Sequence, residues 1–331
     1  MRTLYISQQG CYVCLQQESL LVKQRDEVVQ QVPLPLLEQV LMFGQSQLTT
    51  QAIRACLWRD IPVAYLSRMG YCYGRLVAIE RGYRQLARYQ QTLEGVHRLV
   101  VARRIVQAKL LNSRVLLMRQ QRRQGGEGLP LILDTLQHLA EQAGRANTVD
   151  QLMGLEGAGA ASYFEGFGQC LRQPEFTFVA RSRRPPGNPV NAMLSFGYQV
   201  LWNHLLSLIE LQGLDPYYGC LHEGNYRHAA LASDLVEEFR APLVDSLVLW
   251  LVNTRVMDAE ADFKPHNGGC YLNNQGRRKF LKAWLQRMEE SLQSESTDEA
   301  QPRWDLLNRQ VKAFKQFVYS PVEVYTPYRI R

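Results

Sequence analysis

The sequence predicts an α+β fold in which a small N-terminal β-rich domain, residues 1–76, precedes a larger, mainly α-helical domain, residues 77–331. Two patterns support this division. Up to about residue 76, short runs rich in β-branched and aromatic residues alternate with turn residues, which is typical of closely spaced strands. Beyond it, apolar residues recur at the spacing of amphipathic helices. The 331 residues suffice for two domains of roughly 150 residues each.

The β-rich part is expected to contain short strands and one helix. Turn residues such as Gln9-Gly10 and Arg25-Asp26 separate the first strands. A helix is expected from Thr49 to Trp58, because Thr49 or Thr50 can cap its first turn. The expected strands are Thr3–Ile6, Cys11–Leu15, Ser19–Lys23, Glu27–Val32, Gln39–Phe43, Ile61–Leu66 and Tyr71–Arg75.

The second part is expected to be a set of long helices interrupted at glycine and proline. One helix should carry the apolar stripe from Leu99 to Met118, and Thr148 is placed to cap another that continues past Phe167. Arg181–Pro189 is a basic, proline-rich loop, since proline disfavours helix in the residue before it. The polar segment Gln293–Gln301 is expected to be flexible. Further helices are expected at Pro130–Ala143, at Val190–Leu211 and from about Leu231.

Composition argues against membrane and secreted proteins. No apolar run approaches the roughly 18 residues of a membrane-spanning helix, and the N-terminus has no signal-peptide apolar region. The seven cysteines are odd in number and lack a framework spacing, so we expect them to be reduced. Cys11 and Cys14 resemble half a zinc site, but no second pair with ligand spacing follows. The expectation is a cytoplasmic protein with no membrane association.

Positive charge is concentrated in one stretch. The net charge is +7, yet residues 1–80 are close to balanced. The stretch from Arg81 to Arg123 contains eleven arginines and lysines, and its only acidic residue is Glu94. A solvated helix face usually intersperses acids, because like charges one turn apart repel. We therefore expect a polyanionic partner, and nucleic acid in particular.

Three polar segments stand in otherwise apolar surroundings. Glu156 lies among small residues on an expected helix, His222 follows an apolar loop, and Asp234 and Glu237 share one face of a helix. Each segment also has a structural explanation. Glu156 can face solvent beside a tight helix crossing, His222 can be a packed or surface residue, and first-turn acids favour the helix dipole. For each segment alone, the structural explanation is preferred or at least as good.

Together, the three segments suit a divalent-cation site. Two carboxylates and a neutral imidazole are ligands for Mg²⁺ or Mn²⁺, with positions left for water and phosphate oxygens. Such an ion polarises a phosphodiester and activates water or a DNA 3′-hydroxyl for attack. The residue types therefore point to phosphodiester chemistry on the expected nucleic-acid partner.

Three stretches, in this order, resemble the universal CRISPR-associated (Cas) endonuclease-integrase of spacer acquisition. They are Arg184–Tyr198, Gly219–His222 and Leu231–Arg240, and Glu156 lies upstream in the expected helix. The likeness extends over most of the chain and agrees with its β-then-α order. The combination is specific, although each stretch alone is weak.

The resemblance implies roles for the polar residues. Glu156, His222 and Glu237 would ligate Mg²⁺ or Mn²⁺, and Asp234 would be a further catalytic residue beside them. Some members carry Asp where this chain has Glu237, which leaves open whether Glu237 or Asp234 supplies the closer ligand. The DNA contacts expected are Arg181, Arg183, Arg184 and Arg240. For Arg240, pairing with a nearby acid is about equally expected.

The resemblance also implies a reaction and an assembly. Residues 77–331 would be the catalytic, DNA-binding domain, and residues 1–76 would join a homodimer. Two such dimers would flank a dimer of a small companion adaptation protein, giving a heterohexamer. The 3′-hydroxyl of prespacer DNA would attack the repeat ends of a CRISPR array by transesterification.

Two other functions fit the same residues. A metal-dependent nuclease of branched or single-stranded DNA would use the same site with water as the nucleophile. A non-catalytic nucleic-acid scaffold would need the basic residues but not the acids. Substitution of Glu156, His222 and Glu237 separates the scaffold from the two enzymes, and the reaction products separate the enzymes from each other.

Overall fold

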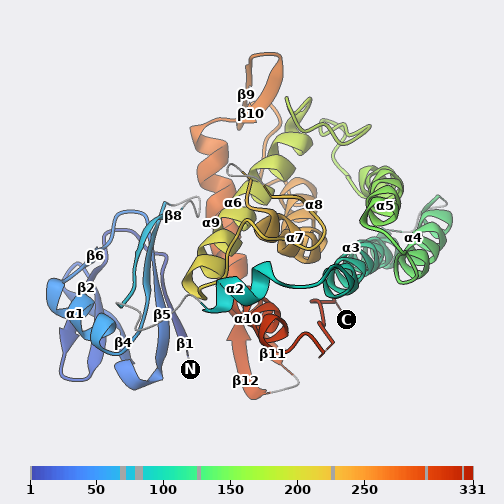
Figure 1. The fold of residues 1–331 in the computed structure, drawn as a ribbon. Coiled ribbons are helices and arrows are strands. Elements are labelled where there is room, and N and C mark those ends of the chain that lie inside the picture. The colour runs from blue at the N-terminus through green and yellow to red at the C-terminus, as the bar shows by residue number, and fades with distance from the viewer. Residues whose placement is uncertain are drawn as a thin grey trace.

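The computed structural model describes residues 2–67, 72–78, 85–124, 128–224, 228–294, 297–322 and 324–330. It confirms the predicted α+β class. A strand-rich N-terminal region lies beside a larger group of helices (Figure 1). Part of the expected strand Tyr71–Arg75 is observed as β8, but Tyr71 itself lies outside the described residues, as do Arg81 and Gly125.

Two four-stranded sheets form the N-terminal region. The first has the order β1 (Arg2–Ile6), β5 (Leu37–Phe43), β7 (Val63–Leu66), β8 (Cys72–Leu76), and its first three strands are parallel. The second has the order β4 (Glu27–Pro33), β3 (Ser19–Gln24), β2 (Tyr12–Gln16), β6 (Gln47–Leu48). A short 3₁₀ turn, η1 (Leu34–Leu36), separates β4 from β5.

One core holds the two sheets together. Val13 and Leu20 from the second sheet share a buried cluster with Leu4 and Val40 from the first. Helix α1 (Thr50–Trp58) adds Ala52 to the same cluster. The hydroxyl of Thr49 accepts a hydrogen bond from the Ala52 amide at 3.2 Å, so Thr49 is the predicted cap.

The other face of the first sheet packs on the helices. Because successive side chains of a strand point to opposite faces, Val40 enters the sheet core while Leu41 and Phe43 enter the helical core. Phe43 and His204 stack with ring centroids 5.6 Å apart, and Trp304 lies 4.8 Å from His204. The strand-rich region is therefore in apolar contact with the helical one.

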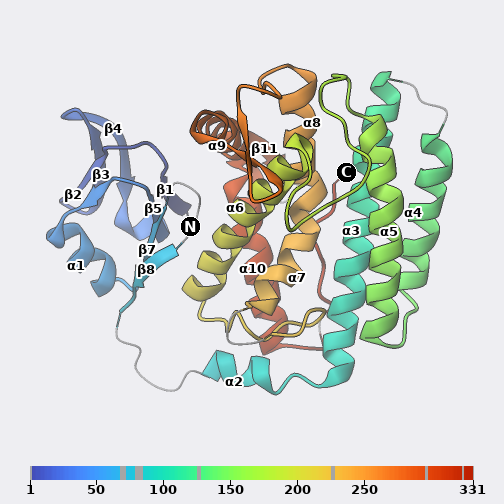
Figure 2. The same ribbon diagram turned by 90° about the horizontal axis from the view of Figure 1, so that it is seen from above.

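Three long helices stand side by side at one end of the helical region (Figure 2). They are α3 (Gly95–Gln124), α4 (Leu129–Ala143) and α5 (Val149–Gln169). The centre is formed by α6 (Pro189–Leu211), α7 (Ala230–Phe239), the π-helical turn η2 (Arg240–Asp245) and α8 (Ser246–Asn253). Helices α2 (Gln85–Gln91), α9 (Asn274–Glu289) and α10 (Trp304–Tyr319) pack around it.

Two short hairpins complete the chain, and one corrects a prediction. Strands β11 (Ser291–Ser294) and β12 (Thr297–Pro302) pair antiparallel, whereas Gln293–Gln301 was expected to be flexible. Residues 295–296 lie outside the described residues; for the rest of the segment the expectation was wrong, because a ladder satisfies backbone groups whatever the polarity of the side chains. The other hairpin joins β9 (Phe263–His266) to β10 (Gly269–Leu272).

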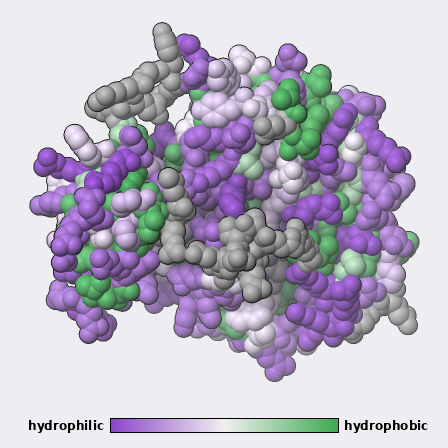
Figure 3. Space-filling model, turned by 90° about the horizontal axis from the view of Figure 1, so that it is seen from below, coloured by the Kyte–Doolittle hydropathy of each residue, from purple (hydrophilic) through white to green (hydrophobic). Residues whose placement is uncertain are grey.

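The surface agrees with the composition. Hydrophilic residues cover most of the face in Figure 3, and apolar residues form smaller patches between them. Within the described ranges, none of the helices combines the length and apolar character that crossing a bilayer requires. All seven cysteines are free thiols, as predicted.

Candidate metal and catalytic site

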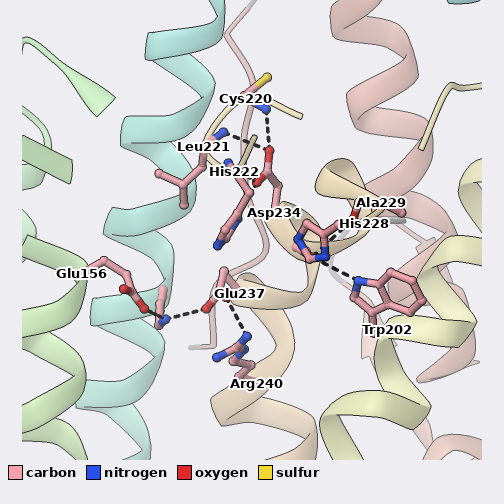
Figure 4. Close-up of polar contacts among 12 residues, drawn as sticks. Glu156, Trp202, Cys220, Leu221, His222, His228, Ala229, Asp234, Glu237 and Arg240 are labelled. Atoms are coloured by element: carbon pink, nitrogen blue, oxygen red, sulfur yellow. Dashed lines mark hydrogen bonds and ion pairs between the residues drawn. The ribbon is translucent and has the colours of Figure 1, made fainter. Parts of the chain in front are cut away.

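Two carboxylates from different helices meet around one lysine. The ammonium of Lys109 on α3 contacts Glu156 Oε1 from α5 and lies 2.5 Å from Glu237 Oε2 on α7 (Figure 4). The side chains are 10%, 16% and 3% exposed, respectively. The interpretation that Glu156 faces solvent is therefore wrong. The helix crossing turns it inward, onto Lys109.

The small residues around Glu156 permit this close crossing. A Cβ added at Gly159 would overlap Leu110 of α3, so α5 can approach α3 this closely only because no side chain stands there. Gly154 and Gly157 face open space instead. The tight helix crossing predicted from this segment is confirmed, and it coexists with a buried acid.

Glu237 is held by a second cation from its own helix. Arg240 Nη2 lies 2.9 Å from Glu237 Oε1, and its guanidinium covers the ring of Tyr198 at 4.7 Å. Pairing of Arg240 with a nearby acid is thus confirmed. Burial alone would raise the pKa of Glu237, but Arg240 and Lys109 outweigh it and lower that pKa to about 2.

Helix position does not explain these acids. Because α7 begins at Ala230, Asp234 and Glu237 lie beyond the first turn, where the helix dipole has little effect. The interpretation of Asp234 and Glu237 as ordinary helix N-terminal acids is therefore wrong.

Asp234 organises the loop that carries His222. Its fully buried carboxylate accepts hydrogen bonds from the amides of Cys220 (2.5 Å), Leu221 (3.0 Å) and His222 (2.9 Å). A Cβ at Gly219 would lie only 2.8 Å from Asp234 Oδ2, so this approach requires glycine. Both oxygens of Asp234 are therefore used within the loop.

The same carboxylate orients the imidazole. His222 Nδ1 lies 2.8 Å from Asp234 Oδ1, which leaves Nε2 for another partner. In Figure 4 the ring extends from Asp234 towards Glu237. Burial lowers the pKa of His222, but the hydrogen bond and charge of Asp234 outweigh it, so the pKa is raised overall.

A backbone irregularity follows the site directly. Pro242 cannot donate the helical hydrogen bond to Glu238, and the turn η2 widens there into a π-helix. Asn112 Nδ2 donates to the Glu238 carbonyl instead, at 2.8 Å. Arg240 lies at the start of η2, three residues after Glu237, where ordinary helical spacing brings the two side chains together.

The predicted DNA-contact arginines differ in their surroundings. Arg181 donates to Asn191 Oδ1 at 2.8 Å and to Ser195 Oγ at 2.9 Å, so it braces the basic loop internally. Arg183 and Arg184 are exposed. A contact of any of them with DNA stays a prediction.

The donor set suits a divalent cation, although the ligands are not assembled around one. Within the described parts of the chain, no three His, Cys, Asp or Glu side chains are arranged to hold an ion. Instead, Lys109 occupies the position between Glu156 and Glu237. Two oxygens that each contact one ammonium at about 2.8 Å lie at most roughly 5.6 Å apart.

An orphaned atom supports the same fit. Glu237 Oε2 is buried and, among the described residues, lacks an aligned hydrogen-bond donor despite its ionic contact with Lys109. Lys109 therefore stands where a cation is required, and two carboxylates with an imidazole are donors that Mg²⁺ or Mn²⁺ accepts. We call Lys109, Glu156, His222, Asp234, Glu237 and Arg240 the carboxylate site.

Sequence reasoning did not single out Lys109. It was counted only among the basic residues of residues 81–124. One feature distinguishes it in the sequence: it is the single lysine in a run that also contains ten arginines. Arginine and lysine differ when buried, since a compact ammonium fits between two carboxylates more readily than a planar guanidinium.

Comparisons with known proteins agree with this architecture. A family model described as CRISPR associated protein Cas1 matches residues 4–286. A CRISPR-associated endonuclease Cas1 of Thermus thermophilus is 33% identical over 332 residues, covering 99% of this chain and 97% of that protein. A Cas4/Cas1 fusion of Geobacter sulfurreducens is 36% identical over 300 residues, and there the match covers 87% of this chain. The chain spans only about half, 53%, of that fusion.

Solved structures share the fold. A Cas1 protein from Thermotoga maritima has a TM-score of 0.69 at 25% identity, with 97% of each chain covered. A chain of a partial Cas6-RT-Cas1–Cas2 complex has a TM-score of 0.84 at 24% identity, covering 100% of this chain and 99% of that one. A casposase bound to integration product has a TM-score of 0.75 at 22% identity over the full length of both chains. The last two show likeness of fold alone.

Proposed function

The chain belongs to the CRISPR-associated Cas1 family, and on that premise we propose that it is the DNA integrase of CRISPR adaptation. It would join the 3′-hydroxyl of prespacer DNA to the repeat ends of a CRISPR array by metal-dependent transesterification. The observation that carries this proposal is the convergence of Glu156 and Glu237 on one buried cation, beside an imidazole oriented by Asp234.

In this proposal Glu156, Glu237 and His222 Nε2 hold Mg²⁺ or Mn²⁺. A bound ion would polarise the scissile phosphodiester and favour the deprotonated form of the attacking hydroxyl. Glu237, rather than Asp234, is the ligand of α7, because both Asp234 oxygens already serve the loop amides and His222. Asp234 is a positioning residue, of the kind that fixes the orientation of ligating histidines.

Lys109 and Arg240 balance the charge of the acids. They keep Glu237 ionised, and an ionised carboxylate is the form that binds a cation. A divalent ion between Glu156 and Glu237 requires the Lys109 ammonium to move away from that position. The freed ammonium would remain near the reacting phosphate, where a cation stabilises the developing negative charge.

Partners follow from the family. Two matched structures are named as complexes of Cas1 with Cas2, and a third as a Cas1–DNA complex. We propose that this chain likewise acts on DNA with a small companion protein, as a heterohexamer and in the cytoplasm. We further propose that residues 1–76 form the dimerisation domain and residues 77–331 the catalytic, DNA-binding domain.

A joining assay tests the proposal. The protein, with and without its companion, would be incubated with Mn²⁺ or Mg²⁺, a duplex with free 3′-hydroxyls and a supercoiled plasmid carrying a CRISPR repeat array. We expect covalent joining of the labelled duplex to a repeat end. A chelator should abolish joining, and a duplex with 3′-dideoxy ends should not be joined.

The other outcomes contradict the proposal in different ways. Plasmid fragments without joined product would indicate a metal-dependent nuclease that uses water as its nucleophile. DNA activity that survives in Glu156→Gln, His222→Ala and Glu237→Gln would indicate a scaffold.

A further inference from the structure

One buried side chain joins three parts of the chain beside the carboxylate site. Asn112 of α3 is only 1% exposed. Its Nδ2 donates to the carbonyl of Glu238 at 2.8 Å and to the carbonyl of Tyr328 at 2.9 Å, and its Oδ1 accepts from the Ile330 amide at 2.9 Å. Figure 2 shows the C-terminal end of the chain lying between α8 and α3. The Asn112 amide therefore links α3 to α7 and to the C-terminal segment 326–330.

The contact with α7 replaces a hydrogen bond that the helix cannot make. Pro242 has no amide hydrogen, so the Glu238 carbonyl lacks the donor that ordinary helical spacing would supply from residue 242. A buried carbonyl without a donor is costly. Asn112 supplies the donor from another helix. The last turn of α7 thus depends on α3 for a bond that most helical turns make internally.

This turn of α7 carries Glu237. Lys109 and Asn112 are three residues apart on α3, so they lie on one face of that helix. Lys109 lies 2.5 Å from Glu237 Oε2, and Asn112 binds the carbonyl of the next residue, Glu238. Entry of a metal ion between Glu156 and Glu237 requires the Lys109 contact to break. The Asn112 contact is made to the backbone and can persist.

The C-terminal segment fixes the orientation of the Asn112 amide. Asn112 binds the carbonyl of Tyr328 and the amide two residues further on, as a residue of an adjacent strand does. The rings of Phe239 and Tyr328 stack with centroids 5.0 Å apart, which fastens the segment to the end of α7. With its oxygen and one N–H held in this way, Asn112 directs its second N–H at the Glu238 carbonyl.

We propose that Asn112 is a positioning residue of the carboxylate site. Through the Glu238 carbonyl it holds Glu237 opposite Glu156 when the Lys109 ammonium gives way to Mg²⁺ or Mn²⁺. This inference rests on the proposed function, since it assigns what keeps the two acids together after the lysine has left. In this role Asn112 contacts neither the ion nor DNA, and it acts as outer-shell partners of metal ligands do.

Asn253 at the end of α8 provides a matched control. Its Oδ1 accepts from the Arg172 amide at 2.9 Å, and its Nδ2 donates to the Cys170 carbonyl at 2.9 Å. It therefore binds a carbonyl and the amide two residues further on, as Asn112 does. In the described parts of the chain, these contacts involve no residue of the carboxylate site. Asn253→Leu removes the same kind of pairing without touching the turn of Glu237.

The Mn²⁺ affinity of the full chain, measured by calorimetric titration, tests the proposal. Asn112→Leu should weaken Mn²⁺ binding by about 10- to 100-fold, because the turn that carries Glu237 loses its donor. Asn253→Leu should stay within about threefold of wild type, because the change is independent of the site. Thermal melting verifies that each variant is folded at the temperature of the titration.

A second substitution should rescue the first. Pro242→Ala gives residue 242 an amide that can donate to the Glu238 carbonyl. Asn112→Leu/Pro242→Ala should bind Mn²⁺ within about fivefold of Pro242→Ala alone. A role of Asn112 in holding only the C-terminal segment would not be repaired by an amide at residue 242.

Hydrogen–deuterium exchange of the metal-free proteins gives a readout that needs no bound ion. Amides of residues 234–241 should exchange at least about 10-fold faster in Asn112→Leu than in wild type. Pro242→Ala should reverse this increase, and Asn253→Leu should not show it. Asn112→Ser, whose small side chain admits water to the freed carbonyls, is the milder variant to use if the leucine variant does not fold.

Three results would overturn the proposal. The first is wild-type exchange and wild-type Mn²⁺ affinity in the Asn112 variants. The second is a loss that Pro242→Ala does not repair, and the third is an equal loss in Asn253→Leu, which would assign Asn112 to general stability. If the wild-type chain binds no Mn²⁺, the proposed function fails on its own, and hydrogen exchange still decides whether Asn112 holds the turn of Glu237.

Discussion

The carboxylate site differs in its charge from the arginine groove, which lies between the end of α3, α8, α10 and the C-terminal segment 326–330. In the site, Lys109 and Arg240 are neutralised by Glu156 and Glu237. In the groove, the described lining has seven arginines and no acid. The pKa of Glu237 is lowered to about 2 by its cations, while that of Arg287 is lowered to about 10 by burial and Arg303.

The way in which a region balances its charge indicates which ligand it can take. A buried acid pair with a lysine between its two carboxylates suits exchange of that lysine for a metal cation, while Arg240 continues to balance part of the charge of Glu237. A groove whose described lining holds arginines and no acids has a positively charged surface instead. Altering the carboxylate site should therefore leave the rest of the molecule intact, and the predictions below run from changes in that site to a buried group outside it.

The largest effect is expected from removing one ligand charge. Glu237→Gln should lower DNA joining by about 10³-fold, because it deletes an ionised oxygen ligand where charge develops. DNA affinity measured without metal should change less than about threefold, because phosphate contacts lie on other residues. Joining is measured at saturating DNA, so that binding and chemistry are separated.

The neighbouring glutamate provides a matched control. Burial raises the pKa of Glu238 to about 8, so the side chain is largely protonated near neutral pH and an amide resembles it. Glu238→Gln should keep joining within about threefold of wild type. A loss equal to that of Glu237→Gln would mean that the two sides of α7 do not act separately.

A smaller effect is expected at the residue that orients His222. Asp234→Asn should weaken Mn²⁺ affinity by about 10- to 100-fold. The NH₂ group of the asparagine would face the N–H donors that Asp234 now accepts from, and the imidazole of His222 would lose its fixed orientation. Asp215→Asn makes the same change in the same loop, where Asp215 Oδ1 accepts from the Tyr217 amide. Calorimetric titration should show nearly wild-type Mn²⁺ affinity for this control. Equal affinities in the two variants would remove the positioning role.

The smallest effect is expected at a buried group outside both regions. His204 stacks near Phe43 and Trp304, and neither ring nitrogen has a hydrogen-bond partner among the described residues. Burial lowers its pKa to about 3. The folded pKa lies below the unfolded value, so the unfolded chain takes up the proton first. Stability is present above pH 6.5 and falls as the pH is lowered.

The difference between the folded and unfolded pKa of His204 determines how strongly stability depends on pH. Between pH 7 and pH 5 the free energy of unfolding should fall by about 2 kcal/mol on account of His204. In His204→Phe, the free energy of unfolding measured with denaturant should fall by about 2 kcal/mol less than in wild type over the same pH range. The same dependence in the variant and in wild type would show that this contact does not govern acid sensitivity.

Much of the fold could be predicted from periodicity and capping. Thr49 and Thr148 cap helices as expected, because an N-cap is determined by residues close in sequence. The hairpin at β11–β12 could not be predicted, because its strands are polar and their pairing depends on backbone hydrogen bonds. Helix α10 was not predicted, although Leu307, Val311, Phe314 and Val318 recur at the spacing of a buried helix face.

The site could be predicted only in part. Family likeness selected Glu156, His222 and Glu237, but local pattern favoured a solvent-facing Glu156. Local pattern cannot reveal which helix packs against Gly159, and that contact turns Glu156 onto Lys109. The roles of Lys109 and of the C-terminal segment depend on contacts between distant residues such as Asn112 and Tyr328, which one sequence does not disclose.

Pulsed electron paramagnetic resonance of bound Mn²⁺ tests the central claim most directly, because it reports nitrogen atoms bonded to the ion. We predict one tightly bound Mn²⁺ with nitrogen modulation from an imidazole. The modulation should vanish in His222→Ala, binding should weaken strongly in Glu156→Gln and Glu237→Gln, and both should persist in Glu238→Gln. A bound ion without nitrogen modulation, or modulation that survives in His222→Ala, would contradict the assignment of His222 and the two glutamates to one metal.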